Sequence, residues 1–201
     1  VEETGAIPVV LAVARDRPEA LRAAYAEALE FDVVLSTGGV SVGNFDYVRR
    51  VQAELGVVEK FWKVAQKPGK PLTFGLFRGR PVFGLPGNPV STLVCFYVYV
   101  LPALRKLVGA EAPYLPVVEA EVEEDIGTAE TLTEFVRCQL EGPAHGYRVR
   151  ATGSQSSGVL RSMSAGDALA ISPPGTALLR KGSTVRALVL GRDAAAPQPP
   201  F

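Results

Sequence analysis

Residues 32–90 contain three short loops, STGGVSVGN at 36–44, KPGKP at 67–71 and LPGNPV at 85–90. Each loop follows or separates short apolar segments that are typical of β-strands. Loops of this composition at strand ends form anion-binding pockets, because backbone N–H groups and lysine ammonium groups converge there. Three such loops close together therefore predict a ligand site and not a set of ordinary turns.

The apolar segments around these loops predict an α/β layered domain. The segment at 31–36 is apolar enough to be buried on both faces, as strands of a parallel sheet are. Ligands of such sheets bind at the carboxyl ends of the strands, where the three loops fall. The expected elements are a strand at 8–14, a helix from the N-cap Asp16 to Glu30, a strand at 31–36, a helix at 46–55, a strand at 57–64, a hairpin at 72–85 and a helix from the N-cap Asn88 to Leu107.

After residue 111 the pattern changes to short strand-like segments separated by turns. This pattern predicts a small β-barrel or sandwich at 112–190, after a first domain at 1–111. The tail at 191–201 is expected to be disordered. The strands expected in the second domain are 117–124, 131–140, 147–151, 167–172 and 184–190.

The overall charge is balanced, with 21 basic and 21 acidic residues in a chain of 201 that is 47% hydrophobic. This composition indicates a globular protein and argues against a nucleic-acid partner. The charges are unevenly placed, since 60–80 holds basic residues and no acid, whereas 119–134 holds acids and no base. We expect the basic cluster to face an anionic ligand and the acidic run to be a solvated strand face.

The uncharged stretch at 81–104 raises the question of a membrane span. It is interrupted at 86–89 by PGNP, and its remaining apolar part at 93–104 contains Pro102. This part is shorter than the ~20 residues that a span needs. The sequence therefore predicts a buried helix and no membrane partner.

Metal and nucleophile signals of the usual kinds are weak in this chain. Cys95 lies in an apolar run that predicts a buried free thiol, and no C-x-x-C pair occurs. His145 is the single histidine and falls in a turn-like segment. We therefore expect neither a zinc site nor a histidine-based nucleophilic triad.

Two acidic residues open predicted helices and have two possible roles each. As helix caps, Asp16 and Asp46 would contribute about 1 kcal/mol apiece. In a phosphate-rich pocket Asp46 could instead hold Mg²⁺ or position a reacting group. The pattern favours the cap for Asp16 and leaves both roles open for Asp46.

Three lysines, Lys63, Lys67 and Lys70, lie close together in the basic cluster. Lysine runs are usually solvated, but Pro68 and Pro71 stiffen this loop and would hold the ammonium groups in place. The helix that begins after Asn88 would add a positive end to the same pocket, with an ordinary capped helix as the alternative.

In the second domain, alternation would turn Arg137 away from Val136 and Cys138. The hydroxyl-rich loop TGSQSSG at 152–158 carries no function by composition alone.

Taken together, these motifs resemble one family. GGVSVG followed by DY, FWKV with KPGKP, and LPGNPV occur in the order and spacing of the MoeA-type molybdopterin molybdenumtransferases, which include the gephyrin E-domain. EFVR at 134–137 and TGSQSSG at 152–158 are similar to motifs in the C-terminal β-barrel of that family. The first domain alone would also fit the wider molybdopterin-binding fold, including adenylyltransferases and competence-damage relatives.

The resemblance implies a three-layer α/β domain with a mostly parallel sheet, followed by a small all-β barrel. It implies the last step of molybdenum cofactor synthesis, in which adenylylated molybdopterin is hydrolysed with a divalent metal such as Mg²⁺, molybdate enters the dithiolene and AMP leaves. It also implies a cytoplasmic location, a homodimer for the full-length protein, and a molybdopterin adenylyltransferase as a possible partner.

The resemblance also assigns roles to individual residues. The pocket for the pterin phosphate and nucleotide would consist of Gly38, Gly39, Ser41, Gly43, Pro68, Gly69, Pro86, Gly87 and Asn88. Molybdate would be held by Lys67, Lys70, Pro71, Arg137 and Ser157. The catalytic residues would be Asp46, Lys63, Lys67 and Asp16, with Asp46 acting through Mg²⁺.

One departure from the family leaves alternatives open. Family members carry two elongated N-terminal domains and a first strand with a TGDE-like loop, and none of these is found in this sequence. We therefore expect a fragment that binds more weakly than its parent or is inactive. The alternatives are a pterin- or nucleotide-binding module without turnover, a molybdopterin adenylyltransferase that would use ATP, and a scaffold role.

Overall fold

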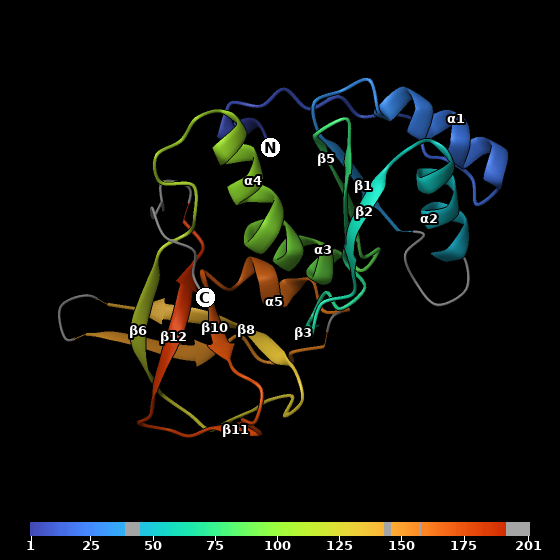
Figure 1. Cartoon of the computed structure of the whole chain (residues 1–201). Coiled ribbons are helices and arrows are strands. Elements are labelled where there is room, and N and C mark those ends of the chain that lie inside the picture. Colours follow the sequence, from blue (N-terminus) through green and yellow to red (C-terminus); the bar gives the residue numbers. More distant parts are fainter. Residues whose placement is uncertain (39–44, 143–145, 157, 192–201) are drawn as a thin grey trace.

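The computed structural model describes residues 1–38, 45–142, 146–156 and 158–191, with only the backbone of residues 45 and 46. Figure 1 shows two halves, an α/β half above and a β-barrel below, with β3 and α5 where they meet. This arrangement confirms the predicted α/β domain followed by a small barrel. The predicted tail falls almost entirely outside the described residues.

The α/β half is built on a four-stranded sheet with the order β1-β5-β4-β2. Its strands are β1 (Val34–Thr37), β5 (Arg80–Leu85), β4 (Thr73–Phe77) and β2 (Val58–Trp62). β1 and β5 are parallel, whereas β4 is antiparallel to both β5 and β2. The described part of the sheet is therefore mixed and not mostly parallel, because the predicted hairpin contributes two of its strands.

Helices cover both faces of this sheet and form the expected three layers. On one face lie α1 (Pro18–Ala28) and α2 (Phe45–Glu54). On the other lies a continuous helix made of α3 (Pro89–Cys95), the π-helical segment η2 (Phe96–Val100) and α4 (Leu101–Leu107). The neighbours Val82 and Phe83 of β5 point to opposite faces and belong to the two separate cores.

The strand expected at 8–14 is wrong. The structure has a short 3₁₀ helix, η1 (Glu2–Thr4), and then extended chain that pairs with no described strand. Val10 and Val13 are 93% and 97% exposed, so the apolar pattern that predicted a strand is not accompanied by burial or by strand pairing within the described residues. The helix that follows begins one position later than predicted, with Arg17 as N-cap and Pro18 as its first residue.

The helix at 89–107 has the length and apolar character of a membrane span, with a mean hydropathy of 1.4. Half of this apolar segment is buried inside the protein. Its two sides pack into two different cores, with Val94 in one and Cys95 in the other. Pro102 follows the π-helical segment, whose altered hydrogen bonding accommodates the missing N–H of proline. This packing is typical of a core helix in a globular domain.

The second half is a closed barrel whose five main strands were all predicted. They are β6 (Val117–Val122), β8 (Thr133–Glu141), β9 (Tyr147–Ala151), β10 (Ala168–Ser172) and β12 (Thr184–Val189). The order β10-β12-β6-β9-β8 closes through the pairing of β10 with β8. Two short strands, β7 (Ile126–Gly127) and β11 (Leu178–Leu179), and one helical turn, α5 (Arg161–Ser164), were not predicted.

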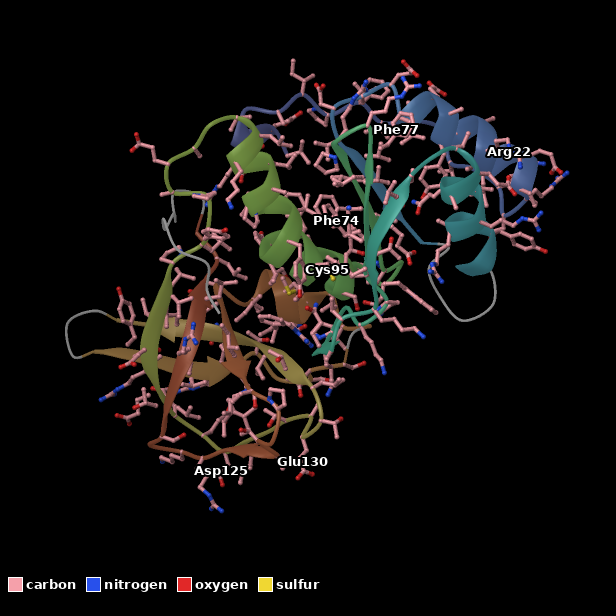
Figure 2. The ribbon with its side chains drawn as sticks, viewed as in Figure 1. Arg22, Phe74, Phe77, Cys95, Asp125 and Glu130 are labelled. Atoms are coloured by element: carbon pink, nitrogen blue, oxygen red, sulfur yellow. The ribbon has the colours of Figure 1, made fainter. Side chains whose placement is uncertain are left out.

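The acidic run is mainly a solvated strand face, as expected. Glu119 and Glu121 of β6 are exposed, whereas the alternating Ala120 and Val122 are buried in the barrel core. Figure 2 shows Asp125 and Glu130 at the end of the barrel that points away from the α/β half. Glu134 is the exception, because it is only 1% exposed.

The two halves are joined in two ways. A short strand of the α/β half, β3 (Gln66–Lys67), pairs in parallel with β8 of the barrel. One apolar cluster also contains helix residues such as Val94 and barrel residues such as Leu169, both fully buried. The structure therefore places a shared core across the predicted boundary between the domains.

Candidate functional site

The loops that follow β1 and β5 meet at one edge of the sheet. The register pairs Thr37 with Leu85, and the Gly38 N–H donates to the Leu85 carbonyl at 3.2 Å. A Cβ atom on Gly87 would lie 3.1 Å from the Gly38 Cα, and Gly38 has a φ of +84°. The close approach disfavours a side chain at Gly87, and the left-handed φ favours glycine at position 38. Three further predicted residues of this pocket, Gly39, Ser41 and Gly43, lie outside the described residues.

The loop at 86–88 is tied to the helix that follows it. Asn88 is the N-cap of α3, and its side-chain oxygen accepts from the Val90 N–H at 3.1 Å. The Thr92 hydroxyl contacts the carbonyls of both Pro86 and Asn88. Asn88 thus caps the helix in the ordinary way. Its side chain occupies the Val90 N–H, which could otherwise donate a hydrogen bond to a bound anion.

We call residues 67–71 the lysine turn. It is closed by hydrogen bonds from the Val64 N–H to the Lys70 carbonyl (2.9 Å) and from the Leu72 N–H to the Gly69 carbonyl (3.2 Å). Pro68 and Gly69 are buried, whereas Lys70 is exposed. The turn therefore presents Lys70 to solvent, while its Pro-Gly centre faces the protein interior.

Lys67 is the residue through which the barrel reaches this turn. Its ammonium Nζ lies 3.0 Å from Oε1 of Glu134 on β8. The second carboxylate oxygen of Glu134 accepts from the Ala129 N–H at 2.5 Å. Half of the Lys67 side chain is exposed while Glu134 is buried, so the lysine is the solvent-facing partner of a buried carboxylate.

Position 69 requires glycine because the Cys95 and Gln66 side chains leave no room for a Cβ atom. A Cβ there would be 2.5 Å from the Cys95 sulfur and 2.7 Å from Nε2 of Gln66, and φ is +100°. Figure 2 shows Cys95 near the centre of the molecule, where the helix faces the β3 segment. Cys95 is a buried free thiol, as predicted, and its burial raises the pKa of the thiol to about 12.

Lys63 lies near helix α2, because both contact the ring of Trp62. Lys63 has a left-handed φ of +64°, and its ammonium group lies 3.9 Å from the centre of the Trp62 ring. Arg49 of α2 contacts the same ring at 4.3 Å. Because Asp46 lies one turn before Arg49, the start of α2 is close to Lys63. The side chain of Asp46 itself lies outside the described residues.

Arg137 is 1% exposed and organises the loop at 152–156. Its guanidinium donates to the hydroxyl of Ser162 at 3.1 Å and to the carbonyls of Ser154 and Ser156 at 3.4 and 3.2 Å. Burial lowers the pKa of the guanidinium, and the Glu134 charge opposes this shift. Arg137 faces away from the barrel core that holds Val136 and Cys138, as the alternation predicted. Ser157 lies outside the described residues.

Asp16 is not brought to this group of residues. It precedes α1, whose Arg22 forms an ion pair with Glu54 at the last residue of α2. The loops and Lys63 lie toward the first residue of α2. Figure 2 shows Arg22 on the outer side of the α/β half, away from Cys95.

Sequence reasoning missed four residues that shape the site: Gln66, Tyr99, Glu134 and Trp62. Glu134 falls in the acidic run, and only its pairing with Lys67 across the two halves distinguishes it. Gln66 directly precedes Lys67, but its burial could not be read from the sequence. Among the residues that the structure describes, no group of three His, Cys, Asp or Glu side chains could hold a metal ion.

Comparison with known families accounts for most of the chain. Residues 1–106 match the family described as "Probable molybdopterin binding domain", and residues 119–190 match "MoeA C-terminal region (domain IV)". The chain belongs to the MoeA family. The two matched segments correspond to the α/β half and the barrel, so the family and fold predicted from the sequence are confirmed.

Individual relatives agree with this assignment. The chain is 37% identical to a gephyrin of Dictyostelium discoideum and 35% identical to a molybdopterin molybdenumtransferase of Nostoc sp., with alignments that cover 80% and 94% of the chain. It spans only 26% and 45% of those relatives' own lengths. The crystal structure of the MoeA protein of Pyrococcus horikoshii matches 89% of the chain and 42% of its own length, with 31% identity and a TM-score of 0.71.

Proposed function

We propose that this chain is the part of a molybdopterin molybdenumtransferase that binds adenylylated molybdopterin and receives molybdate, with release of AMP. The observation that carries the proposal is the meeting of the Gly38 and Gly87 loops at one edge of the sheet in the α/β half. The lysine turn of the same half is joined to the barrel through β3 and β8. The names of the relatives support the reaction class. Because the chain spans less than half of these relatives, turnover is proposed for the longer protein.

The two glycine loops would bind the phosphates of the substrate. The close contact between Gly38 and Gly87 leaves backbone at the surface where a side chain would otherwise block a phosphate group. Gly39, Ser41 and Gly43 would complete this pocket, and Asn88 would fix the second loop.

The lysine turn would hold molybdate, a tetrahedral dianion. Lys70 is exposed and would bind it directly, and Pro71 would contribute its backbone. Lys67 would share its ammonium group between molybdate and Glu134. Arg137 is enclosed by its own loop, so we propose that it acts by holding the segment that leads to Ser157.

Asp46 and Lys63 would act on the phosphoanhydride. A single carboxylate such as Asp46, together with substrate phosphates, is a common way of holding Mg²⁺, which neutralises phosphate charge when bound. Lys63 would stabilise the charge that develops on the leaving phosphate. The contact with Trp62 would keep its ammonium group in place.

The test is a calorimetric titration of adenylylated molybdopterin with Mg²⁺ into the chain. Lys70→Ala should weaken the subsequent binding of molybdate, whereas Asp46→Ala should weaken the binding of the nucleotide. Lys60→Ala is the matched control, because Lys60 is an exposed lysine of β2. Molybdate-dependent release of AMP by the longer protein would support the transferase, and consumption of ATP without molybdate would support an adenylyltransferase instead.

A folded chain that binds adenylylated molybdopterin but shows the same affinity in all three variants would contradict this site. Binding without AMP release by the longer protein would favour a binding module. We further propose a cytoplasmic location and, for the longer protein, a homodimer that receives its substrate from a molybdopterin adenylyltransferase. These last proposals rest on the family resemblance. Sedimentation of the longer protein with and without that enzyme tests the homodimer and the partner, and cell fractionation tests the location.

A further inference from the structure

A buried polar cluster lies directly behind the lysine turn. Gln66 is 2% exposed, and its amide Nε2 donates to the Pro68 carbonyl at 2.9 Å. The Tyr99 hydroxyl, from the long helix, donates to Oε1 of the same Gln66 side chain. Both ends of the amide are therefore satisfied, one by the turn and one by the helix.

The fit between this cluster and the turn is tight. Gly69 has no room for a Cβ, since both the Cys95 sulfur and Nε2 of Gln66 lie within 2.7 Å of its position. The Cys95 thiol also contacts the Gly69 carbonyl at 3.7 Å. Consecutive carbonyls of the turn, those of Pro68 and Gly69, are thus held by side chains from behind.

The Tyr99 hydroxyl and the Cys95 thiol stay protonated near neutral pH, as hydrogen-bond donors must. Burial raises the pKa of both the Tyr99 hydroxyl and the Cys95 thiol to about 12. Both groups therefore remain neutral hydrogen-bond donors near neutral pH. A buried amide between neutral donors and acceptors fixes one geometry, because leaving either end unpaired costs free energy.

On its other side the same segment is fixed by the barrel. Gln66 and Lys67 form β3, which pairs with Thr133 and Glu134 of β8. The lysine turn is therefore held by two sets of contacts, the pairing of β3 with the barrel strand β8 and the hydrogen bonds of the Gln66–Tyr99 pair. Changing the rear contact should shift the turn without touching any group that faces the ligand.

We propose that Gln66 and Tyr99 are positioning residues that fix the lysine turn and so set the affinity of the site for a tetrahedral oxyanion. The affinity part of this inference rests on the proposed function, whereas the conformational part does not. Gln66→Met keeps the length of the side chain and removes its hydrogen bonds to the Pro68 carbonyl, the Tyr99 hydroxyl and the Cys95 sulfur. Tyr99→Phe keeps the ring and removes only the hydroxyl.

The experiment has two readouts on the 201-residue chain. Molybdate is titrated calorimetrically in the presence of Mg²⁺ and adenylylated molybdopterin, and amide hydrogen exchange is followed at Val64 and Leu72, whose bonds close the turn. We expect the molybdate affinity to fall about tenfold in Gln66→Met and about threefold in Tyr99→Phe, given the net value of one or two buried hydrogen bonds. Exchange at Val64 and Leu72 should be faster, and exchange at the core residue Val82 should be unchanged.

Tyr97→Phe is the matched control, because Tyr97 is a half-buried tyrosine of the same helix. It should change neither readout. If the unaltered chain binds no molybdate, the proposed function fails for this chain, and hydrogen exchange still decides the positioning role. If the unaltered chain binds and Gln66→Met binds equally well with unchanged exchange, the positioning role is overturned and the proposed function stands. An equal rise in exchange at Val82 in both variants would mean a global loss of stability and would also overturn it.

Discussion

The barrel and the α/β half differ in how their strands are paired. Each of the five main barrel strands has a partner on both sides, because β10 pairs with both β12 and β8. Within the described residues, the sheet of the α/β half ends at β1 and β2, and the apolar chain at 6–15 pairs with no strand. The residues proposed to face the ligand lie mostly on the open half, whereas the closed half supports them through Glu134 and Arg137.

The barrel contributes directly to the support of the lysine turn. Glu134 gives the lysine turn a buried anionic anchor, and the shared cluster fixes the barrel against the long helix. An open sheet alone would leave the lysine turn with support from one side. The closed half therefore adds support on the second side of the lysine turn, which the proposed anion site would need.

The largest expected effect tests whether the halves are independent. Leu169 of β10 is fully buried in the shared cluster, so Leu169→Ala should reduce the free energy of unfolding by about 2–5 kcal/mol. The single tryptophan, Trp62, lies in the α/β half and reports on that half alone. We expect the urea midpoint measured by its fluorescence to fall, although the substitution is in the barrel.

The matched control for this experiment is Val149→Ala, which removes a fully buried side chain from the barrel core away from the α/β half. If the halves unfold as one unit, both variants move the Trp62 transition. If Leu169→Ala lowers only the barrel signal in circular dichroism, the halves are separate folding units and the comparison breaks down.

The next effect concerns the ion pair between the halves. Lys67→Ala would leave the buried Glu134 carboxylate without its cation, so we expect a loss of about 1–3 kcal/mol, reduced from the fully buried case by the exposure of the lysine. Glu134→Gln leaves a lysine that can turn to solvent, and should cost less. Urea unfolding of both variants and of the Lys60→Ala control measures the asymmetry. Equal losses of stability for Lys67→Ala and Glu134→Gln would contradict the idea that the buried carboxylate needs the lysine more than the lysine needs the carboxylate.

The same difference in strand pairing decides which strands could be predicted from the sequence. The five barrel strands were predicted because each is a short strand-like segment bounded by turns, and each pairs with strands that the same sequence contains. The segment at 8–14 has an equally good strand pattern, but a pattern does not say whether a partner is present. Strand propensity is realised only by pairing, and here the prediction was wrong for that reason.

For the site, the loops were predictable and their supports were not. Clusters of Gly and Pro are typical of turns, so the loops around Gly38, Gly69 and Gly87 could be located from the sequence. The burial of Glu134, 67 positions after Lys67, depends on the pairing of β3 with β8, which no local pattern encodes. Likewise Gln66 and Tyr99 become a pair only when the long helix packs behind the turn.

A smaller effect should appear at alkaline pH and should be shared by both halves. Burial raises the pKa of Cys95 in the α/β half and of Cys138 in the barrel from 9.0 to about 12. Between these values the unfolded chain loses the thiol protons while the folded protein keeps them. Stability is therefore fully present below pH 9 and falls as the pH rises toward 12, by about 1 kcal/mol per thiol at pH 10.

Urea midpoints at pH 8 and pH 10 measure this fall. Cys95→Ala should flatten the slope in part, and Cys138→Ala should flatten it by a similar amount, because the two thiols are shielded alike. A slope that neither substitution changes would mean that other groups cause the alkaline loss.

The smallest effect on stability is expected in the extended apolar segment at 6–15, which pairs with no described strand, unlike the strands of the barrel. Val10 and Val13 are almost fully exposed, so Val10→Lys and Val13→Lys should change the free energy of unfolding by less than about 0.5 kcal/mol. Exposed apolar strand-like segments favour association between molecules, and a charge opposes it. Light scattering at increasing protein concentration should therefore show less self-association in both variants, while Ala12→Lys, at an exposed small residue, should have a weaker effect. A loss of stability above 1 kcal/mol would instead show that these valines are packed in solution, and the α/β half would then be as fully paired as the barrel.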